Sequence, residues 1–320
     1  MPRALAAAFA TLVAVTAASC DFEQIVELDV PPYEPHLVVG GFPTPDSVLA
    51  VRVGQSVSVL DPSSEESRPI VLDAARVAIF DEAGVLLDSL RYERDDAYSF
   101  FGAHRSGSGF VPSPGQTYTL RISAPGLSDA EATTRIPVPV PFEVRYEGEI
   151  ETPYEYERRV RLVVTLDDPV GEQAYALSVS SVLEVDGEPP RWLSHPFRST
   201  DPVLKGGIEE IDTAVGIDFQ SGDYFSVAYF RDRLFAGASR EMELELSIFT
   251  YYAQEEDIDE LTVELAVMDE DYVRYQQTLQ TQRINNENPF AEPVRLHTNV
   301  RGGTGVFAGY ATYQVTVPID

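Results

Sequence analysis

The chain has 320 residues, of which 44% are hydrophobic and 10% aromatic, so it can bury a sizeable core and is not an intrinsically disordered protein. Its 52 acidic residues outnumber its 23 basic ones, and the net charge of −29 argues against a nucleic-acid partner. A single cysteine excludes an internal disulfide, and the length favours two domains.

The first twenty residues have the features of a bacterial lipoprotein signal. Arg3 precedes an apolar stretch over 4–16, and the small residues 17–19 lead to Cys20. Small-small-Cys resembles the lipobox, in which the cysteine is acylated and becomes the mature N-terminus, although Ala17 stands where Leu is usual. The alternative is an ordinary signal peptide that leaves a free thiol. We expect the lipoprotein, because an exposed thiol is a liability in an oxidising compartment.

The segments that follow predict a tether and then a first β domain. We expect a signal peptide over 1–19, a proline-containing tether over 20–35 and a β-sandwich over 36–136, similar to transthyretin-like or immunoglobulin-like modules. Apolar runs bounded by turn residues predict its strands, near 37–41, 48–53, 76–80, 85–90, 117–122 and 131–136. The residues 81–84 between two of these runs predict a hairpin.

Alternating prolines mark the end of this region. Pro137, Pro139 and Pro141 favour an extended segment, so 137–141 is predicted to be a linker, with an edge strand as the alternative. We expect a larger β domain over 142–320. Its predicted strands lie near 158–166, 173–185, 241–248, 261–267, 305–310 and 312–317.

One helix is predicted in this mainly β chain, over about 269–284. Asp269 is a plausible N-cap, and two acids follow it where the helix dipole is positive. Tyr272, Tyr275 and Leu279 then fall at i, i+3 and i+7, which places them on one face. The predicted fold class is therefore an N-terminal β-sandwich followed by a larger β domain with one C-terminal helix.

The sequence predicts no catalytic centre, no cofactor and no metal site. The four histidines lack metal-ligand spacing. Gly302, Gly303 and Gly305 lack the Lys-Ser/Thr of a phosphate-binding loop, so we expect a tight turn or bulge with positive φ there. The acidic run at 254–260 could bind calcium, but it lacks the alternating spacing of a calcium loop. Exposed aromatic residues could form a sugar- or protein-binding surface, with Tyr154, Tyr156, Trp192, Tyr251 and Tyr252 as candidates.

The C-terminal end carries the most specific pattern. After the segment 268–272 and the helix come the motif residues Asn288, Pro289, Phe290, Glu292, Pro293, Asn299, Gly302, Gly303, Gly305, Phe307 and Tyr310. With Asp168, Tyr175 and the stretch 231–237, this pattern resembles the uncharacterised lipoprotein family called domain of unknown function 4249, common in Bacteroidota-type bacteria. Arg301 departs from the acidic or amide residue that the family often has. We expect these motif residues to pack the helix onto a sheet, with a partner-docking loop as the alternative.

The resemblance implies an outer-membrane lipoprotein with no established reaction, often encoded beside a TonB-dependent transporter. Asp21 and Glu23 are similar to the signal that sends such lipoproteins to the cell surface. We therefore expect a protein anchored to the outer membrane through Cys20, on its extracellular face. Its expected role is to help a TonB-dependent barrel take up a nutrient or peptide. A free-standing surface module that binds glycan or matrix is the alternative, and an enzyme is not expected.

Overall fold

The computed structural model describes residues 33–58, 70–94, 102–154, 157–183, 190–206, 225–249, 258–286, 291–292 and 294–319. By its contacts the chain divides into two units, Met1–Glu34 and Pro35–Asp320, and every described helix and strand belongs to the second. The predicted signal peptide, the lipidation residue Cys20 and the export residues Asp21 and Glu23 lie outside the described residues. Among the described helices, none combines the length and the apolarity that crossing a membrane requires.

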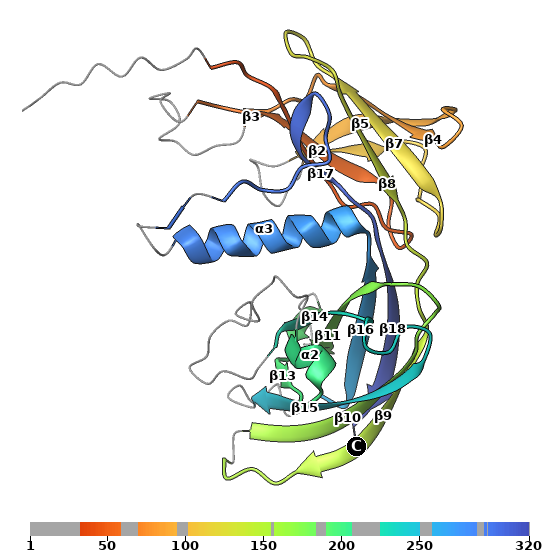
Figure 1. The fold of residues 1–320 in the computed structure, drawn as a ribbon, viewed down its shortest axis with the longest axis vertical. Helices are drawn as coiled ribbons and strands as arrows, with labels where there is room; N and C mark the ends of the chain where they lie inside the picture. The colour runs from red at the N-terminus through yellow and green to blue at the C-terminus, as the bar shows by residue number, and fades with distance from the viewer. Residues whose placement is uncertain are drawn as a thin grey trace, which may run out of the picture. The chain divides into compact units, whose positions relative to one another are not determined.

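The first sheet has the strand order β17-β1-β2-β6-β5-β4-β7-β8, with β3 attached to β2 (Figure 1). Its strands are β1 (Leu37–Gly41), β2 (Ala50–Gln55), β3 (Ile70–Val71), β4 (Arg76–Asp81), β5 (Leu86–Arg94), β6 (Gly102–Ser106), β7 (Thr117–Ser123), β8 (Ala130–Arg135) and β17 (Gly303–Phe307). Alternate residues along these strands point inward, as the period of two requires. They form one apolar core, which includes Leu37, Val39, Val51, Val77, Ile79, Leu120, Ile122 and Phe307.

The two ends of this sheet meet. Glu131 on β8 and Arg301, just before β17, form an antiparallel bridge with backbone N–H to O distances of 2.9 and 2.8 Å. The sheet therefore folds over its own core in a sandwich-like arrangement. The hairpin predicted at 81–84 is present, since β4 and β5 pair antiparallel around Gly84, whose φ is 80°.

Strand β17 comes from the far end of the chain. It pairs in parallel with β1, from Leu37 opposite Gly303 to Gly41 opposite Phe307. The sequence places this segment in the region 142–320, whereas the structure joins it to the sheet of region 36–136. Residues 137–141 form no strand and connect β8 to β9. The domain boundary expected there stays a prediction.

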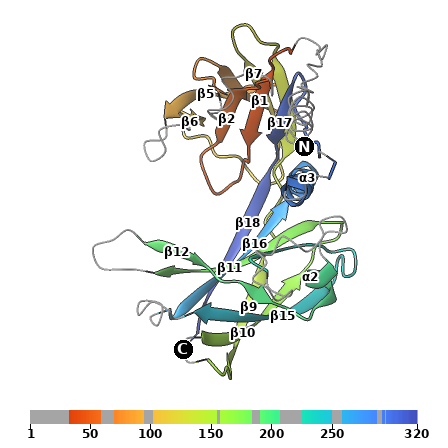
Figure 2. The same cartoon turned by 90° about the vertical axis from the view of Figure 1, so that its left-hand side faces the viewer.

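The remaining strands form two sheets that share a second core (Figure 2). One sheet has the order β13 (Phe197–Arg198), β15 (Ser239–Phe249), β10 (Glu157–Asp167) and β9 (Phe142–Ile150). The other has the order β12 (Arg191–Ser194), β11 (Ala174–Leu183), β16 (Glu260–Met268) and β18 (Tyr310–Pro318), and β14 (Val227–Arg231) pairs with β11. Their inward residues are fully buried, among them Val160, Leu162, Val164, Leu177, Leu244 and Leu265.

The mainly β fold class and the C-terminal helix are confirmed. Helix α3 (Glu270–Asn286) begins where predicted, and Asp269 caps it by accepting a hydrogen bond from the backbone N–H of Asp271 at 3.3 Å. The ring of Tyr272 lies 5.3 Å from that of Phe42 and 5.5 Å from that of Tyr310. The predicted face of Tyr272, Tyr275 and Leu279 is only half-buried. Val273, next to Tyr272 in the chain, is fully buried.

The sequence missed several shorter or more polar elements. Strand β9 was not predicted, although its apolar residues Phe142, Val144, Tyr146 and Ile150 alternate with charged ones. The short helix α2 (Pro202–Gly206) spans about one turn and carries no periodic pattern. Strands β6, β12, β13 and β14 were not predicted either.

Candidate functional site

The start of helix α3 is held by a hydrogen-bond network that joins three elements. The Thr134 hydroxyl on β8 donates to Asp269 Oδ2 at 2.6 Å and accepts from the backbone N–H of Gly309 at 2.7 Å. The backbone N–H of Asp269 donates to the carbonyl of Gly309 at 3.0 Å. The helix cap is thus shared with the first sheet and with the turn between β17 and β18.

Asn299 extends this network from the family motif. Its Oδ1 accepts from the backbone N–H of Phe307 at 2.9 Å, and its Nδ2 donates to the Phe307 carbonyl at 2.8 Å and to Asp271 Oδ2 at 3.0 Å. Asp271 Oδ1 lies 2.8 Å from Nε2 of His297. The Asn299 amide therefore satisfies both backbone groups of a buried residue and ties them to the helix, which is a structural role.

Two motif glycines have the positive φ that the sequence predicted. Gly302 has a φ of 78° and Gly305 a φ of 108°. A Cβ at Gly305 would collide with the backbone of Val39, and one at Gly302 with the carbonyl of Asp129. Any larger residue would therefore push β17 away from its neighbours.

The other motif residues divide between structural positions and undescribed ones. Tyr310 packs against the helix as expected, and Phe307 is buried in the first core. Glu292 is exposed, and its carbonyl accepts from Asn285 Nδ2 at 2.9 Å. Gly303 pairs with Leu37. Asn288, Pro289, Phe290 and Pro293 lie outside the described residues.

Three further residues named in the resemblance meet in a buried cluster. Tyr175 donates through its hydroxyl to Asp168 Oδ1 at 2.5 Å, and the backbone N–H of Gly237 donates to Asp168 Oδ2 at 2.9 Å. Asp232, which is 0% exposed, accepts from the backbone N–H of Gln173 at 2.8 Å. The turn 231–237 and the entry to β11 are thereby locked together. The sequence contained these residues but not the information that they meet.

The second carboxyl of this cluster has a raised pKa. Burial, with the neighbouring carboxylate of Asp168, raises the pKa of Asp232 to about 6, against the opposing effect of the Gln173 N–H. Its Oδ1 is enclosed without a hydrogen-bond partner among the described atoms. Because no ligand can reach a fully buried carboxyl group, this pair is a structural feature rather than an acid–base site.

A buried Ser–His pair also lacks access. Ser181 Oγ lies 2.8 Å from His195 Nε2, and both side chains are buried in the second region. Burial lowers the pKa of His195 to about 4, so the ring is neutral at pH 7. Among the described residues, no group of three or more His, Cys, Asp or Glu is placed to hold a metal ion. Residues 254–257 of the acidic run lie outside the described part of the chain.

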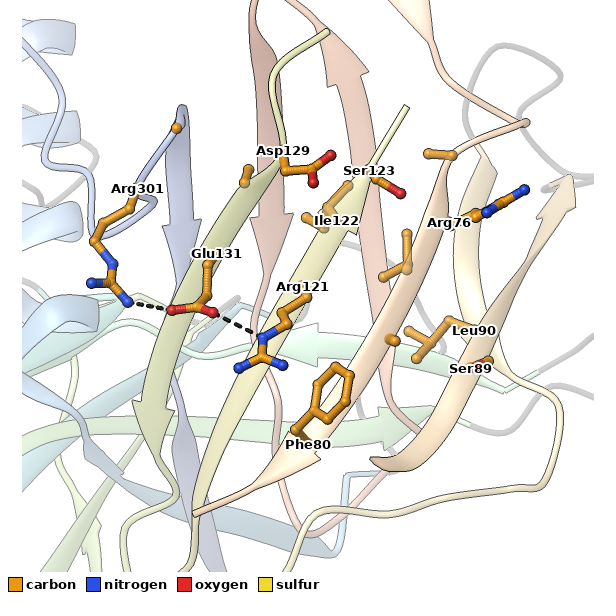
Figure 3. A pocket seen from close by; sticks show the side chains of 15 residues that line it. Arg76, Phe80, Ser89, Leu90, Arg121, Ile122, Ser123, Asp129, Glu131 and Arg301 are labelled. Atoms are coloured by element: carbon orange, nitrogen blue, oxygen red, sulfur yellow. Dashed lines mark hydrogen bonds and ion pairs between the residues drawn. The ribbon is translucent and has the colours of Figure 1, made fainter. Parts of the chain in front are cut away.

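A large exposed hollow lies on the first sheet and carries arginines (Figure 3). We call it the arginine face and define it by Arg76, Phe80, Arg121, Glu131 and Arg301. These residues lie on β4, β7, β8 and the turn before β17, around a cavity of about 920 Å³. Figure 3 shows the carboxylate of Glu131 between the guanidinium groups of Arg121 and Arg301. The ring of Phe80 lies next to the guanidinium of Arg121.

The arginine face is held rigidly by its own contacts. Arg121 Nε lies 2.9 Å from Glu131 Oε2, and Arg301 forms an ion pair with the other carboxylate oxygen. The hydrogen bond from Arg121 lowers the pKa of Glu131, and the charge of Arg301 acts in the same direction. The guanidinium of Arg121 also stacks 4.5 Å from the centre of the Phe80 ring. A flat, fixed guanidinium over an aromatic ring suits binding rather than bond-breaking chemistry.

Exposed apolar residues continue this face along the β4–β5 hairpin. Val85, Leu86 and Leu87 follow one another in the chain and are all exposed. Leu86 is the cross-strand partner of Phe80. Consecutive exposed apolar residues are uncommon on a free surface and mark interaction sites. The sequence predicted the hairpin but did not single out its apolar side chains.

A smaller hollow lies over β1, β2 and β17. We call it the glycine groove, and its cavity has a volume of about 490 Å³. Its lining residues come from these strands, from helix α3 and from the segment before β17: Val38, Val39, Gly40, Phe42, Arg52, Val53, Gly54, Ile70, Val71, Gly102, Tyr275, Arg295, Leu296, His297, Thr298, Thr304, Gly305 and Val306. One motif residue, Gly305, lies on its wall. The motif therefore borders a cavity as well as supporting the helix.

Comparison with solved structures and curated proteins gives little. No curated protein matches the chain. Among solved structures, trypsin-activated alpha-2-macroglobulin from Escherichia coli matches with 10% identity and a TM-score of 0.19, covering 78% of this chain. A Salmonella alpha-2-macroglobulin mutant matches with 8% identity and a TM-score of 0.22, covering 92% of this chain. The chain spans 15% of the length of each. Likeness at these scores supports no inference.

The family comparison is more informative. Residues 23–316 match the family described as "Domain of unknown function (DUF4249)". The match includes the helix-cap network, the buried acid cluster, the arginine face and the glycine groove. The chain belongs to this family.

Proposed function

We propose that this protein is a lipid-anchored binding protein of the outer membrane that assists a TonB-dependent transporter in taking up a nutrient or peptide. Acylation of Cys20 would hold it there, and Asp21 with Glu23 would direct it to the extracellular face. The arginine face is the observation that carries the proposal, as the surface that docks the transporter. Membership of a family whose members resemble outer-membrane lipoproteins supports the anchor.

The residue types of the arginine face favour a protein partner. Arginine and aromatic side chains contribute most of the binding energy in many protein interfaces. Here the Arg121 guanidinium is already fixed by Glu131 and Phe80, so little side-chain entropy is lost on docking. The apolar hairpin residue Leu86 beside Phe80 supplies the surface that such interfaces bury at their centre.

The charge of the arginine face differs from that of the chain. Its lining contains three arginines against two acids, Asp129 and Glu131, whereas the whole chain has a net charge of −29. Arg76 has no ion-pair partner among the described residues and remains available to a partner's carboxylates. Electrostatic complementarity of this kind selects the docking orientation more than it adds affinity.

Affinity purification of the full chain from outer membranes tests the proposal. The wild type is expected to recover an outer-membrane β-barrel, and the double variant Arg121→Ser/Leu86→Ser to lose at least tenfold of it. The matched control is Arg145→Ser/Val170→Ser, which removes an exposed arginine of β9 and a valine that is 94% exposed. Absence of any barrel with the wild type, or equal recovery by the two double variants, would count against the proposal.

The anchor is tested separately by labelling cells with a radioactive fatty acid. Cys20→Ser is expected to abolish the label on this protein and to release the chain from the membrane fraction. Protease treatment of intact cells then reports exposure: the wild type is degraded, and Asp21→Asn/Glu23→Gln is protected if these acids direct export. Label that persists in Cys20→Ser would contradict the lipid anchor.

A glycan-binding module is the second candidate, because one aromatic residue is strongly exposed. Trp192 on β12 is 69% exposed, and Tyr154 is exposed as well. Such rings can stack on sugars. A glycan array probed with the wild type and with Trp192→Ala checks this candidate. Binding that the substitution abolishes would favour it, whereas absence of glycan binding would remove it.

A further inference from the structure

The described lining of the glycine groove has no carboxylate, in a chain that is rich in them. Among the described residues that line it, none is Asp or Glu, although 52 of the 320 residues of the protein are. It has two cationic residues instead, Arg52 and Arg295. A groove with this charge attracts an anion, against the field of the rest of the molecule.

The floor of the groove is open because a glycine occupies its centre. In the strand register, Gly40 lies between Arg52 on β2 and Val306 on β17, so the three residues share one row of the sheet. A Cβ built on Gly40 would meet no atom within 4 Å. The space beside the Arg52 side chain is therefore free, and a ligand can approach the strand backbone there.

Apolar side chains surround this open floor. Val38 and Ile70 are exposed within the groove, as is Phe42, whose ring lies 5.7 Å from that of Tyr275. Val38 lies in the neighbouring row, between Gly54 and Thr304. The groove thus combines an exposed apolar wall with a cation at its floor.

Both cations of the groove are available to a ligand. Neither Arg52 nor Arg295 has an ion-pair partner among the described residues, whereas Arg161 and Arg198 on the second region are each paired with Glu245. An unpaired guanidinium can form two parallel hydrogen bonds to one carboxylate. A carboxylate ligand would complete the charge balance that the protein leaves open.

We propose that the glycine groove binds the C-terminal end of an apolar peptide. Arg52 and Arg295 bind its carboxylate, and Val38, Phe42 and Ile70 contact its last side chain. The cavity of about 490 Å³ is in the size range of small-ligand sites. Hydroxyl and imidazole groups on the wall, including those of Tyr275 and His297, suit the amides of a peptide better than a plain hydrocarbon chain.

This proposal identifies the chemical class of the cargo. It rests on the proposed function only for its biological setting. Binding is therefore measured on the purified full chain in detergent, without a transporter. The probes are the tripeptides acetyl-Ala-Ala-Phe and acetyl-Ala-Ala-Leu, each with a free C-terminal carboxylate or with a C-terminal amide. Isothermal titration calorimetry is expected to show binding of the carboxylates and at least tenfold weaker binding of the amides.

Two variants assign that binding to the groove. Gly40→Val fills the open floor at a position without positive φ, and it is expected to abolish binding while the chain stays folded. Arg52→Gln is expected to weaken carboxylate binding at least tenfold. The matched controls are Thr119→Val on the outer face of the same sheet and Arg191→Gln on exposed β12, and both are expected to bind like the wild type. Thermal unfolding followed by circular dichroism verifies that each variant is folded.

Three results would overturn the proposal. The first is equal affinity for carboxylate and amide peptides, and the second is unchanged binding in a folded Gly40→Val. In the third, dodecanoate binds in a way that Gly40→Val abolishes while neither peptide binds, which would assign the groove to a fatty acid. If the wild type recovers a transporter but binds neither peptide, the docking role is intact and the groove proposal alone is rejected.

Discussion

At the scale of single residues, the most unusual group is the enclosed carboxyl of Asp232. Its pKa of about 6 lies above the ordinary value of 3.8, so the folded state holds a proton that the unfolded state releases. The associated stability is present below pH 4 and is lost as the pH rises through 6. At pH 7 the fold therefore carries an ionised, desolvated group next to Asp168.

Replacing Asp232 by Asn should remove the free-energy cost of burying an ionised carboxylate. The amide can accept from the Gln173 N–H and present its own N–H groups toward Asp168. We expect Asp232→Asn to raise the free energy of unfolding on the order of 3 kcal/mol at pH 7.5 and to change it little at pH 4. Urea unfolding at both pH values measures this. The exposed control Asp73→Asn should show no such pH-dependent gain. An equal gain of Asp232→Asn at both pH values would contradict the raised pKa of Asp232.

His104 leads to a second prediction, in which the pH dependence of stability has the opposite sign. The side chain is buried on β6 without a hydrogen-bond partner for either ring nitrogen among the described atoms, and burial lowers its pKa below 6.5. A lowered pKa in the folded state means that stability is present above pH 6.5 and is lost as the pH falls below it. His104→Phe should therefore be at least as stable at pH 7 and should lose less stability between pH 7 and pH 5.5. Larger loss in the variant would exclude this reading.

The sequence could not identify these buried polar groups. Period-two alternation predicts which residues of a strand face inward, and Leu120 and Ile122 of the strand predicted at 117–122 are buried. It does not tell which loops converge, and Asp168 and Asp232 come from turns that are distant in the chain. Long-range pairing of this kind depends on the packed sheets and not on any local pattern.

At the scale of elements, helix α3 depends on Asn299. The side chain forms four hydrogen bonds, of which two go to Phe307, one to the helix residue Asp271 and one to the Thr133 carbonyl. We expect Asn299→Ala to lower the free energy of unfolding by about 1–3 kcal/mol, because it leaves buried backbone groups without partners. The control Asn285→Ala removes one exposed bond at the other end of the helix and should change stability by less than about 0.5 kcal/mol. Equal effects in urea unfolding would refute the structural role of the motif.

The predictability of the elements followed their burial pattern. Strands with one buried face, such as β7 and β15, were predicted close to their observed bounds. Helix α3 was predicted from its cap, since Asp269 is visible in the sequence. Strand β9 is an exception, because its apolar residues alternate with charged ones and yet it was not predicted.

At the scale of the whole molecule, the net charge of −29 predicts a response to salt. Like charges repel in the compact state, and salt screens that repulsion. We expect the urea midpoint of unfolding to rise between 20 and roughly 500 mM sodium chloride, where the Debye length falls to a few Å. Surface ion pairs such as Arg161–Glu243 weaken in the same range, but such pairs contribute little each. A midpoint that falls with salt would show that the ion pairs dominate.

The sequence predicted the fold class of the whole molecule but not the position of β17. The mainly β class followed from the many short alternating runs and was predicted. The insertion of β17 beside β1 was not, since nothing in the segment 303–307 indicates which strand it will join. The arginine face and the glycine groove were likewise hidden, because each is assembled from strands that are separated in the chain.

The parallel pairing of β1 with β17 also determines when the first sheet can form. Residue 303 must have been synthesised before the β17 edge of β1 is covered, so until then this edge stays unpaired and able to join another chain. Closing a loop of this length slows folding more than it weakens the folded state. A chaperone that shields strand edges would therefore act on this protein until its last strands are synthesised.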